Sequence, residues 1–228
     1  MTAALVAGCC VAGALLGAWL PVDVVPTEDG RTVAEGPRPM PAVVVRSGWG
    51  RVMILATAAL WGALAARVGT AAVLPAYLVA GAGLVALGVV DLRSQLLPRR
   101  IVVPVGVATL GLLAVAAVAT PDGAALLRAI ACGAGAYACF AVLRFVSPRS
   151  LGGGDVNLAA LLGLTLGWRS VDAVLLGLGA GAVLAAAFAL GGLASRRLRL
   201  DAALSYGPFL IAGALLVLLV APDGRLLG

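Results

Sequence analysis

Two aspartates stand out in this sequence because each lies at the end of an apolar segment. Asp91 directly follows the apolar run 84–90, and Asp155 follows three consecutive glycines and opens a further apolar segment. A carboxylate in the hydrocarbon of a membrane costs roughly 2.5–3.5 kcal/mol at a span centre and less near the interface. Taken alone, each aspartate could simply mark a span boundary, and Asp155 lies where a helix N-cap would lie.

Taken together, the two carboxylates predict acid–base chemistry. Two neighbouring, partly desolvated carboxylates share one proton and titrate as a pair. The ionised member could deprotonate an attacking water while the protonated member donates to a peptide carbonyl oxygen. The glycines Gly152, Gly153 and Gly154 place no side chain beside Asp155, so an extended substrate backbone could lie against them.

The rest of the composition excludes other common hydrolytic mechanisms. The chain has no His, and all sixteen basic residues are Arg, which excludes His-based triads and dyads, H-E-x-x-H zinc sites and Ser-Lys dyads. The four cysteines lack C-x-x-C spacing, so we expect no metal and no cofactor. We interpret them as small packing residues and leave open whether they form disulfides. They are Cys9, Cys10, Cys132 and Cys139.

The composition is that of an integral membrane protein. Of the 228 residues, 62% are hydrophobic and 11% are charged, and the mean hydropathy is +1.11. Such a chain cannot cover a water-facing surface with polar groups, which excludes soluble, disordered and nucleic-acid-binding proteins. The net charge of +6 does not indicate a nucleic-acid partner, because the arginines lie singly or in small groups between apolar segments.

The apolar segments predict an all-α, polytopic membrane protein with about eight transmembrane helices. We expect a first transmembrane helix in residues 1–20, a cytoplasmic Pro-rich loop in 21–51, and a membrane domain of seven helices in 52–228. The second and sixth segments are short for a span, and the sixth is interrupted by glycines. The expected spans are Ala3–Leu20, Val52–Ala66, Ala71–Val90, Ile101–Thr120, Ala124–Leu143, Asp155–Trp168, Val171–Ala194 and Tyr206–Val220.

The arginines predict the orientation of these spans. With eight spans, twelve arginines fall on one side and four on the other, so the first side is expected to be cytoplasmic and both termini outside. This orientation puts Asp91 and Asp155 at the cytoplasmic ends of their spans. The twelve are Arg31, Arg38, Arg46, Arg51, Arg93, Arg99, Arg100, Arg144, Arg149, Arg196, Arg197 and Arg199, and the four are Arg67, Arg128, Arg169 and Arg225.

Three segments, in order along the chain, resemble the type IV prepilin peptidases, a branch of the G-x-G-D intramembrane aspartyl proteases. The resemblance covers about residues 71–220. The segments are Asp91-Leu92-Arg93 with Leu97-Pro98 and the apolar residues 101–103, then Gly152-Gly153-Gly154-Asp155-Val156-Asn157-Leu158 with Gly163 and Gly167, and finally Tyr206-Gly207-Pro208-Phe209-Leu210.

The resemblance implies that Asp91 and Asp155 are catalytic, and it adds residues that would bind substrate, namely Gly152, Gly153, Gly154, Pro98, Asn157 and Pro208. The substrate would be a prepilin or pseudopilin with a basic cytoplasmic leader, cut after a Gly at the inner (plasma) membrane. Arg93, Arg99 and Arg100 would repel that leader and could pair with acidic substrate residues instead. Asn157 stands where the family usually has Lys, and Arg99 where Asn often follows the Pro.

Many bacterial members of this family carry a four-cysteine zinc module after the first span and also N-methylate the new terminus. Residues 21–51 contain no Cys, so we expect a short-form peptidase without methyltransferase activity. Its partners would be the precursor and the lipid bilayer, with no nucleic acid, and the oligomeric state is not predicted. Presenilin-like relatives fit less well, because Val90 stands where they have Tyr and no Pro-Ala-Leu element follows.

Two other classes of function remain as alternatives. Intramembrane carboxylates and glycine-interrupted helices also occur in ion or solute transporters, although we find no internal repeat here. A non-catalytic scaffold of a pilus or secretion system could retain the same motifs in degenerate form.

Overall fold

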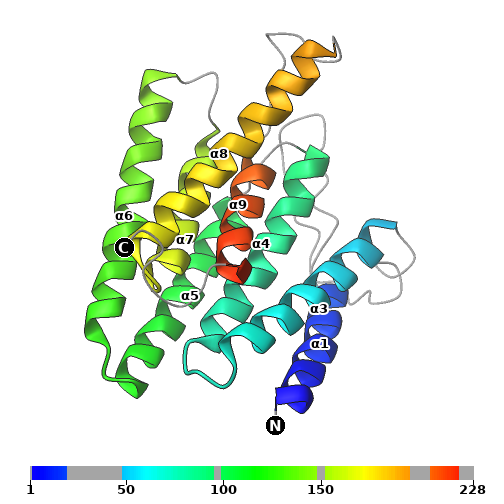
Figure 1. Cartoon of the computed structure of the whole chain (residues 1–228), viewed down its shortest axis with the longest axis vertical. Helices are drawn as coiled ribbons and strands as arrows, with labels where there is room; N and C mark the ends of the chain where they lie inside the picture. The colour runs from blue at the N-terminus through cyan, green and yellow to red at the C-terminus, as the bar shows by residue number, and fades with distance from the viewer. Residues whose placement is uncertain (1, 20–47, 95–98, 148–151, 196–205, 221–228) are drawn as a thin grey trace. The chain divides into compact units, whose positions relative to one another are not determined.

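The computed structural model describes residues 2–19, 48–94, 99–147, 152–195 and 206–220, and these ranges are helical with short turns (Figure 1). The expected fold class is confirmed: the described part of the chain is all-α and polytopic. Its helices are α1 (Thr2–Trp19), α3 (Gly48–Val68), α4 (Leu74–Ser94), α5 (Arg99–Ala119), α6 (Gly123–Val146), α7 (Gly153–Gly167), α8 (Val171–Ala194) and α9 (Gly207–Val220).

The helices correspond to the eight expected spans, but several ends differ. The third span, expected at Ala71–Val90, is α4 at Leu74–Ser94, so Asp91 lies inside the helix and does not follow its end. The second span is longer than expected, because α3 begins at Gly48 and ends at Val68. The sixth begins two residues before Asp155 and has 15 residues, so it remains short. Among the described residues, α3, α4, α5, α6 and α8 are long and apolar enough to cross a membrane, while α1 and α9 contain shorter apolar stretches. Most of the predicted loop 21–51 lies outside the described residues.

The chain forms two compact units, residues 1–96 and 97–228. In the first unit, α3 packs against both α1 and α4. A Cβ at Gly17 of α1 would lie 2.9 Å from the Cα of Ile54 in α3, so this pair of helices needs glycine at the contact. The indole nitrogen of Trp61 in α3 donates to the carbonyl of Leu78 in α4 at 2.9 Å.

In the second unit, α7 packs against α5, α6, α8 and α9, and is therefore surrounded by the other helices of its unit (Figure 1). Close contacts again occur at glycines. A Cβ at Gly163 of α7 would lie 2.7 Å from the carbonyl oxygen of Cys132 in α6, and one at Gly181 of α8 would lie 2.7 Å from the Cα of Leu210 in α9. The short central helix is thus positioned by close backbone contacts.

The cysteines behave as packing residues in part. All four are free thiols, which answers the open disulfide question. The β-carbon of Cys132 lies against Gly167 of α7, whereas Cys139 is exposed. Within the described ranges, no three Cys, Asp or Glu side chains lie close enough together to hold a metal ion.

Candidate active site

Asp91 lies in the last turn of α4 and is almost fully buried, with 1% of its surface exposed. Its neighbours along the helix, Val89 and Val90, are buried as well, and Val89 belongs to a small apolar core with Met53 of α3. A carboxyl group in such surroundings is not explained by the need to mark a helix end with a polar, exposed residue. The burial therefore favours a functional role for Asp91.

Asp155 is also buried, with 7% of its surface exposed. The N-cap of α7 is Gly152, and Asp155 is the third residue of the helix, so the alternative in which Asp155 is itself the N-cap is wrong. Its Oδ2 instead accepts the backbone N–H of Gly152 at 3.1 Å. This bond satisfies one backbone donor of the helix start, and the positive end of the helix dipole suits a carboxylate at that place.

Two of the three glycines before Asp155 have a close neighbour where a side chain would lie. Gly152 is exposed, and a Cβ there would approach the Oδ2 of Asp155 to 3.2 Å. A Cβ at Gly153 would overlap the guanidinium of Arg144. Gly154 is half-buried in the first turn. Side chains at the first two positions would therefore crowd the carboxylate and the guanidinium, in addition to narrowing the space expected for a substrate.

The remaining predicted substrate-binding residues fall into different places. The side-chain amide of Asn157 is half-buried and donates to the carbonyl of Gly153 at 2.9 Å, so it braces the first turn of α7. Pro208 is half-buried in the first turn of α9, a position that suits proline because its missing N–H has no helical acceptor there. Pro98 lies outside the described residues.

The structure thus brings Gly152, Gly153, Asp155 and Asn157 together at the start of α7 through two hydrogen bonds. Asp91 belongs to the first compact unit and Asp155 to the second. The pairing of the two carboxylates and the substrate-binding roles remain predictions.

One residue at this place was missed in the sequence. Arg144, in the last turn of α6, was counted only as a determinant of orientation, but its guanidinium lies against Gly153. A signal for this contact does exist: only six residues separate the end of α6 from the start of α7, so the two helices must form an antiparallel hairpin that brings these ends together.

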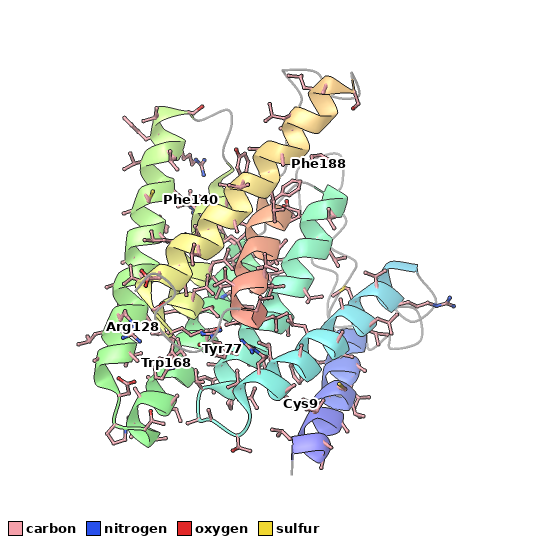
Figure 2. The ribbon with its side chains drawn as sticks, in the orientation of Figure 1. Cys9, Tyr77, Arg128, Phe140, Trp168 and Phe188 are labelled. Atoms are coloured by element: carbon pink, nitrogen blue, oxygen red, sulfur yellow. The ribbon has the colours of Figure 1, made fainter. Side chains whose placement is uncertain are left out.

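The opposite end of α7 also meets an arginine of α6. Arg128 donates to the carbonyl oxygen of Gly167 at 2.9 Å and to that of Trp168 (Figure 2). These are carbonyls that a helix end leaves without intrahelical partners, and a cation there also complements the helix dipole. Arg128 therefore stabilises the end of α7 away from Asp155.

The sequence comparison identifies the chain at family level. No curated protein and no solved structure shows significant similarity to it. The model of the type IV leader peptidase family matches residues 78–195, just over half of the chain. The matched region contains both Asp91 and Asp155 with the helices that carry them. This multi-pass membrane chain therefore belongs to the type IV leader peptidase family.

Proposed function

We propose that this protein is an aspartic endopeptidase that removes the leader of type IV prepilin or pseudopilin-like precursors, with Asp91 and Asp155 as the catalytic pair. The observation that carries the proposal is the burial of both carboxylates, 1% and 7% exposed, in apolar helices within the region matched by a peptidase family. The cost of burying two carboxylates favours a function for them over a role as boundary markers.

In this mechanism the two aspartates hold one proton between them. The ionised carboxylate takes a proton from a water as the water oxygen attacks the scissile carbonyl carbon, and the protonated carboxyl donates to the carbonyl oxygen. Collapse of the tetrahedral intermediate breaks the C–N bond. The leaving nitrogen takes up a proton, so that one peptide bond and one water give a carboxylate and an ammonium group.

The precursor and the side of cleavage are part of the proposal. The excess of arginine on one side supports a cytoplasmic position for both aspartates, where the basic leader of a precursor would also lie. The absence of cysteine in residues 21–51 supports a peptidase without the four-cysteine module and without N-methyltransferase activity.

The test is co-expression with tagged candidate precursors, followed by gel analysis and by mass measurement of the mature N-terminus. We expect the wild type to cut after a Gly and to leave an unmethylated terminus. Asp91→Asn and Asp155→Asn should each lower the cleavage rate by roughly 10²–10⁴-fold, because each removes one partner in proton transfer.

Membrane insertion of each variant, checked by fractionation, is the control. Normal cleavage by either inserted variant would contradict the paired mechanism. A wild type that cuts none of a panel of precursors would contradict the peptidase function and favour a transporter or a scaffold. A methylated terminus would contradict the peptidase-only form.

A further inference from the structure

Arg144 is positioned to act on a molecule bound beside Asp155. It lies in the last turn of α6 with an exposed side chain, yet its guanidinium reaches α7. A Cβ at Gly153 would overlap Nη1 and would lie 3.0 Å from Cζ and 3.4 Å from Nη2. The end of the arginine side chain thus occupies the space that a side chain at Gly153 would need.

The packing of α6 against α7 determines this position. Cβ atoms at Gly163 and Gly167 of α7 would meet Ala136 and Ala129 of α6 respectively, which sets an antiparallel register. Arg144 lies two helical turns beyond Ala136 and therefore projects from the same face of α6. Along this face, the close contacts at mid-helix are followed by Arg144, whose guanidinium lies against Gly153, the first residue of α7 and two residues before Asp155.

The stability of the hairpin does not account for the guanidinium at this point. A cation suits the last turn of α6, but the guanidinium extends to the positive end of α7, where a cation is disfavoured. Arg128 at the other end donates to two carbonyls, whereas Arg144 makes no hydrogen bond or ion pair with any residue in the described ranges. Within the described residues, its N–H donors therefore have no acceptor at the segment that carries Asp155.

We propose that Arg144 is a specificity-determining residue that donates hydrogen bonds to an oxygen acceptor of the bound precursor. This inference rests on the proposed peptidase function. A guanidinium matches a carboxylate or the carbonyl oxygens of an extended backbone, and its charge repels a basic leader. The acceptor therefore belongs to the mature part of the precursor, as an acidic side chain or as main-chain carbonyl oxygens next to the cut.

Two substitutions remove the guanidinium from this place by different routes. Arg144→Gln removes the charge and most of the donors. Gly153→Ala keeps the arginine but displaces its flexible end, because the new methyl group takes the same space. We expect each to raise the KM for the precursor about tenfold or more, as for the loss of a charge-assisted hydrogen bond, with kcat changed less than about twofold.

The double variant gives the decisive comparison. If both changes act by removing the guanidinium, the double variant should have the KM of either single variant, and Arg144→Lys should restore part of the affinity. Gly135→Ala in α6, where a Cβ meets nothing within 4 Å, is the matched control and should behave as the wild type. Additive effects, an effect on kcat alone, or an unchanged KM in Arg144→Gln would overturn the proposal.

A second measurement separates this inference from the peptidase function. Binding of the uncut precursor is measured with the chain in lipid nanodiscs, in an Asp91→Asn background, with and without Arg144→Gln. A precursor that binds but is never cut by the wild type contradicts the peptidase function, and the role of Arg144 is then judged by Kd: an increase of about tenfold supports it, and an unchanged Kd overturns it. Replacing acidic residues of the precursor by Gln shows whether the acceptor is a side chain. If it is, Arg144→Gln should not raise the Kd of the altered precursor any further.

Discussion

At the scale of single residues, Asp155 has a structural task besides the chemistry proposed for it. Its Oδ2 accepts the N–H of Gly152, the N-cap residue of α7. An asparagine side chain keeps an oxygen of the same shape at that position, whereas an alanine side chain does not. The capping contact and the acid–base function can therefore be separated by substitution.

We expect Asp155→Ala to lower the free energy of unfolding by about 1 kcal/mol, the usual cost of losing a side-chain cap. Asp155→Asn should unfold close to the wild type while losing cleavage. Thermal unfolding in detergent, followed by tryptophan fluorescence, measures the first effect, and precursor cleavage measures the second. Equal destabilisation by both substitutions would show that the negative charge, and not the capping bond, is what the helix requires.

At the scale of helices, close glycine contacts and arginine caps position α7. Gly163 and Gly167 bring its backbone against α6, and Arg128 binds its last carbonyls. Arg169 in turn donates to the carbonyl of Leu218 near the end of α9, at 2.8 Å. Arg128 and Arg169 are two of the four arginines expected on the side with fewer of them, so helix capping explains why positive charge is retained there.

The two kinds of glycine in this hairpin should respond oppositely to alanine. Gly163→Ala places a Cβ 2.7 Å from a backbone oxygen of α6, which cannot move alone, and should cost about 1–3 kcal/mol of stability. Gly135→Ala faces open space and should be neutral or stabilise the protein by about 0.5–1 kcal/mol through helix propensity. Unfolding in the same detergent compares them, and an equal effect of both would contradict the packing of α6 against α7.

The sequence predicted the helices well because apolar runs of membrane length leave little choice of structure. It placed several helix ends wrongly. Gly48 and Gly153 resemble loop residues although helices begin there, and α4 continues past Asp91 to Ser94, whereas the sequence predicted an end at Val90. The short connection between α6 and α7 indicates that their ends meet, but the contact of Arg144 with Gly153 could not be predicted from residue types alone, because it also depends on the register of the two packed helices. The burial of Asp91 likewise depends on tertiary packing, although its position after an apolar run pointed to it.

At the scale of the whole molecule, the two candidate catalytic residues come from different compact units, residues 1–96 and 97–228. Paired chemistry therefore requires that α4 and α7 present their aspartates at the same membrane face. Asp91 lies in the last turn of α4 and Asp155 in the first turn of α7. The C-terminal end of α4 and the N-terminal end of α7 must therefore lie at the same membrane face. This requires an even number of membrane crossings between the end of α4 and the start of α7, and the predicted orientation supplies two, α5 and α6.

Labelling of single cysteines in intact cells tests this arrangement, in a chain whose four native cysteines are replaced by alanine. Ser94→Cys follows Asp91 at the end of α4, Ser147→Cys lies between α6 and α7, and Thr120→Cys lies between α5 and α6. A membrane-impermeant maleimide should label Thr120→Cys directly and the other two only after permeabilisation, because positively charged segments stay in the cytoplasm. If Ser94→Cys and Ser147→Cys label from opposite sides, the aspartates lie at opposite faces and cannot share a proton. If both label from outside, the pair survives but leader cleavage at the cytoplasmic face does not.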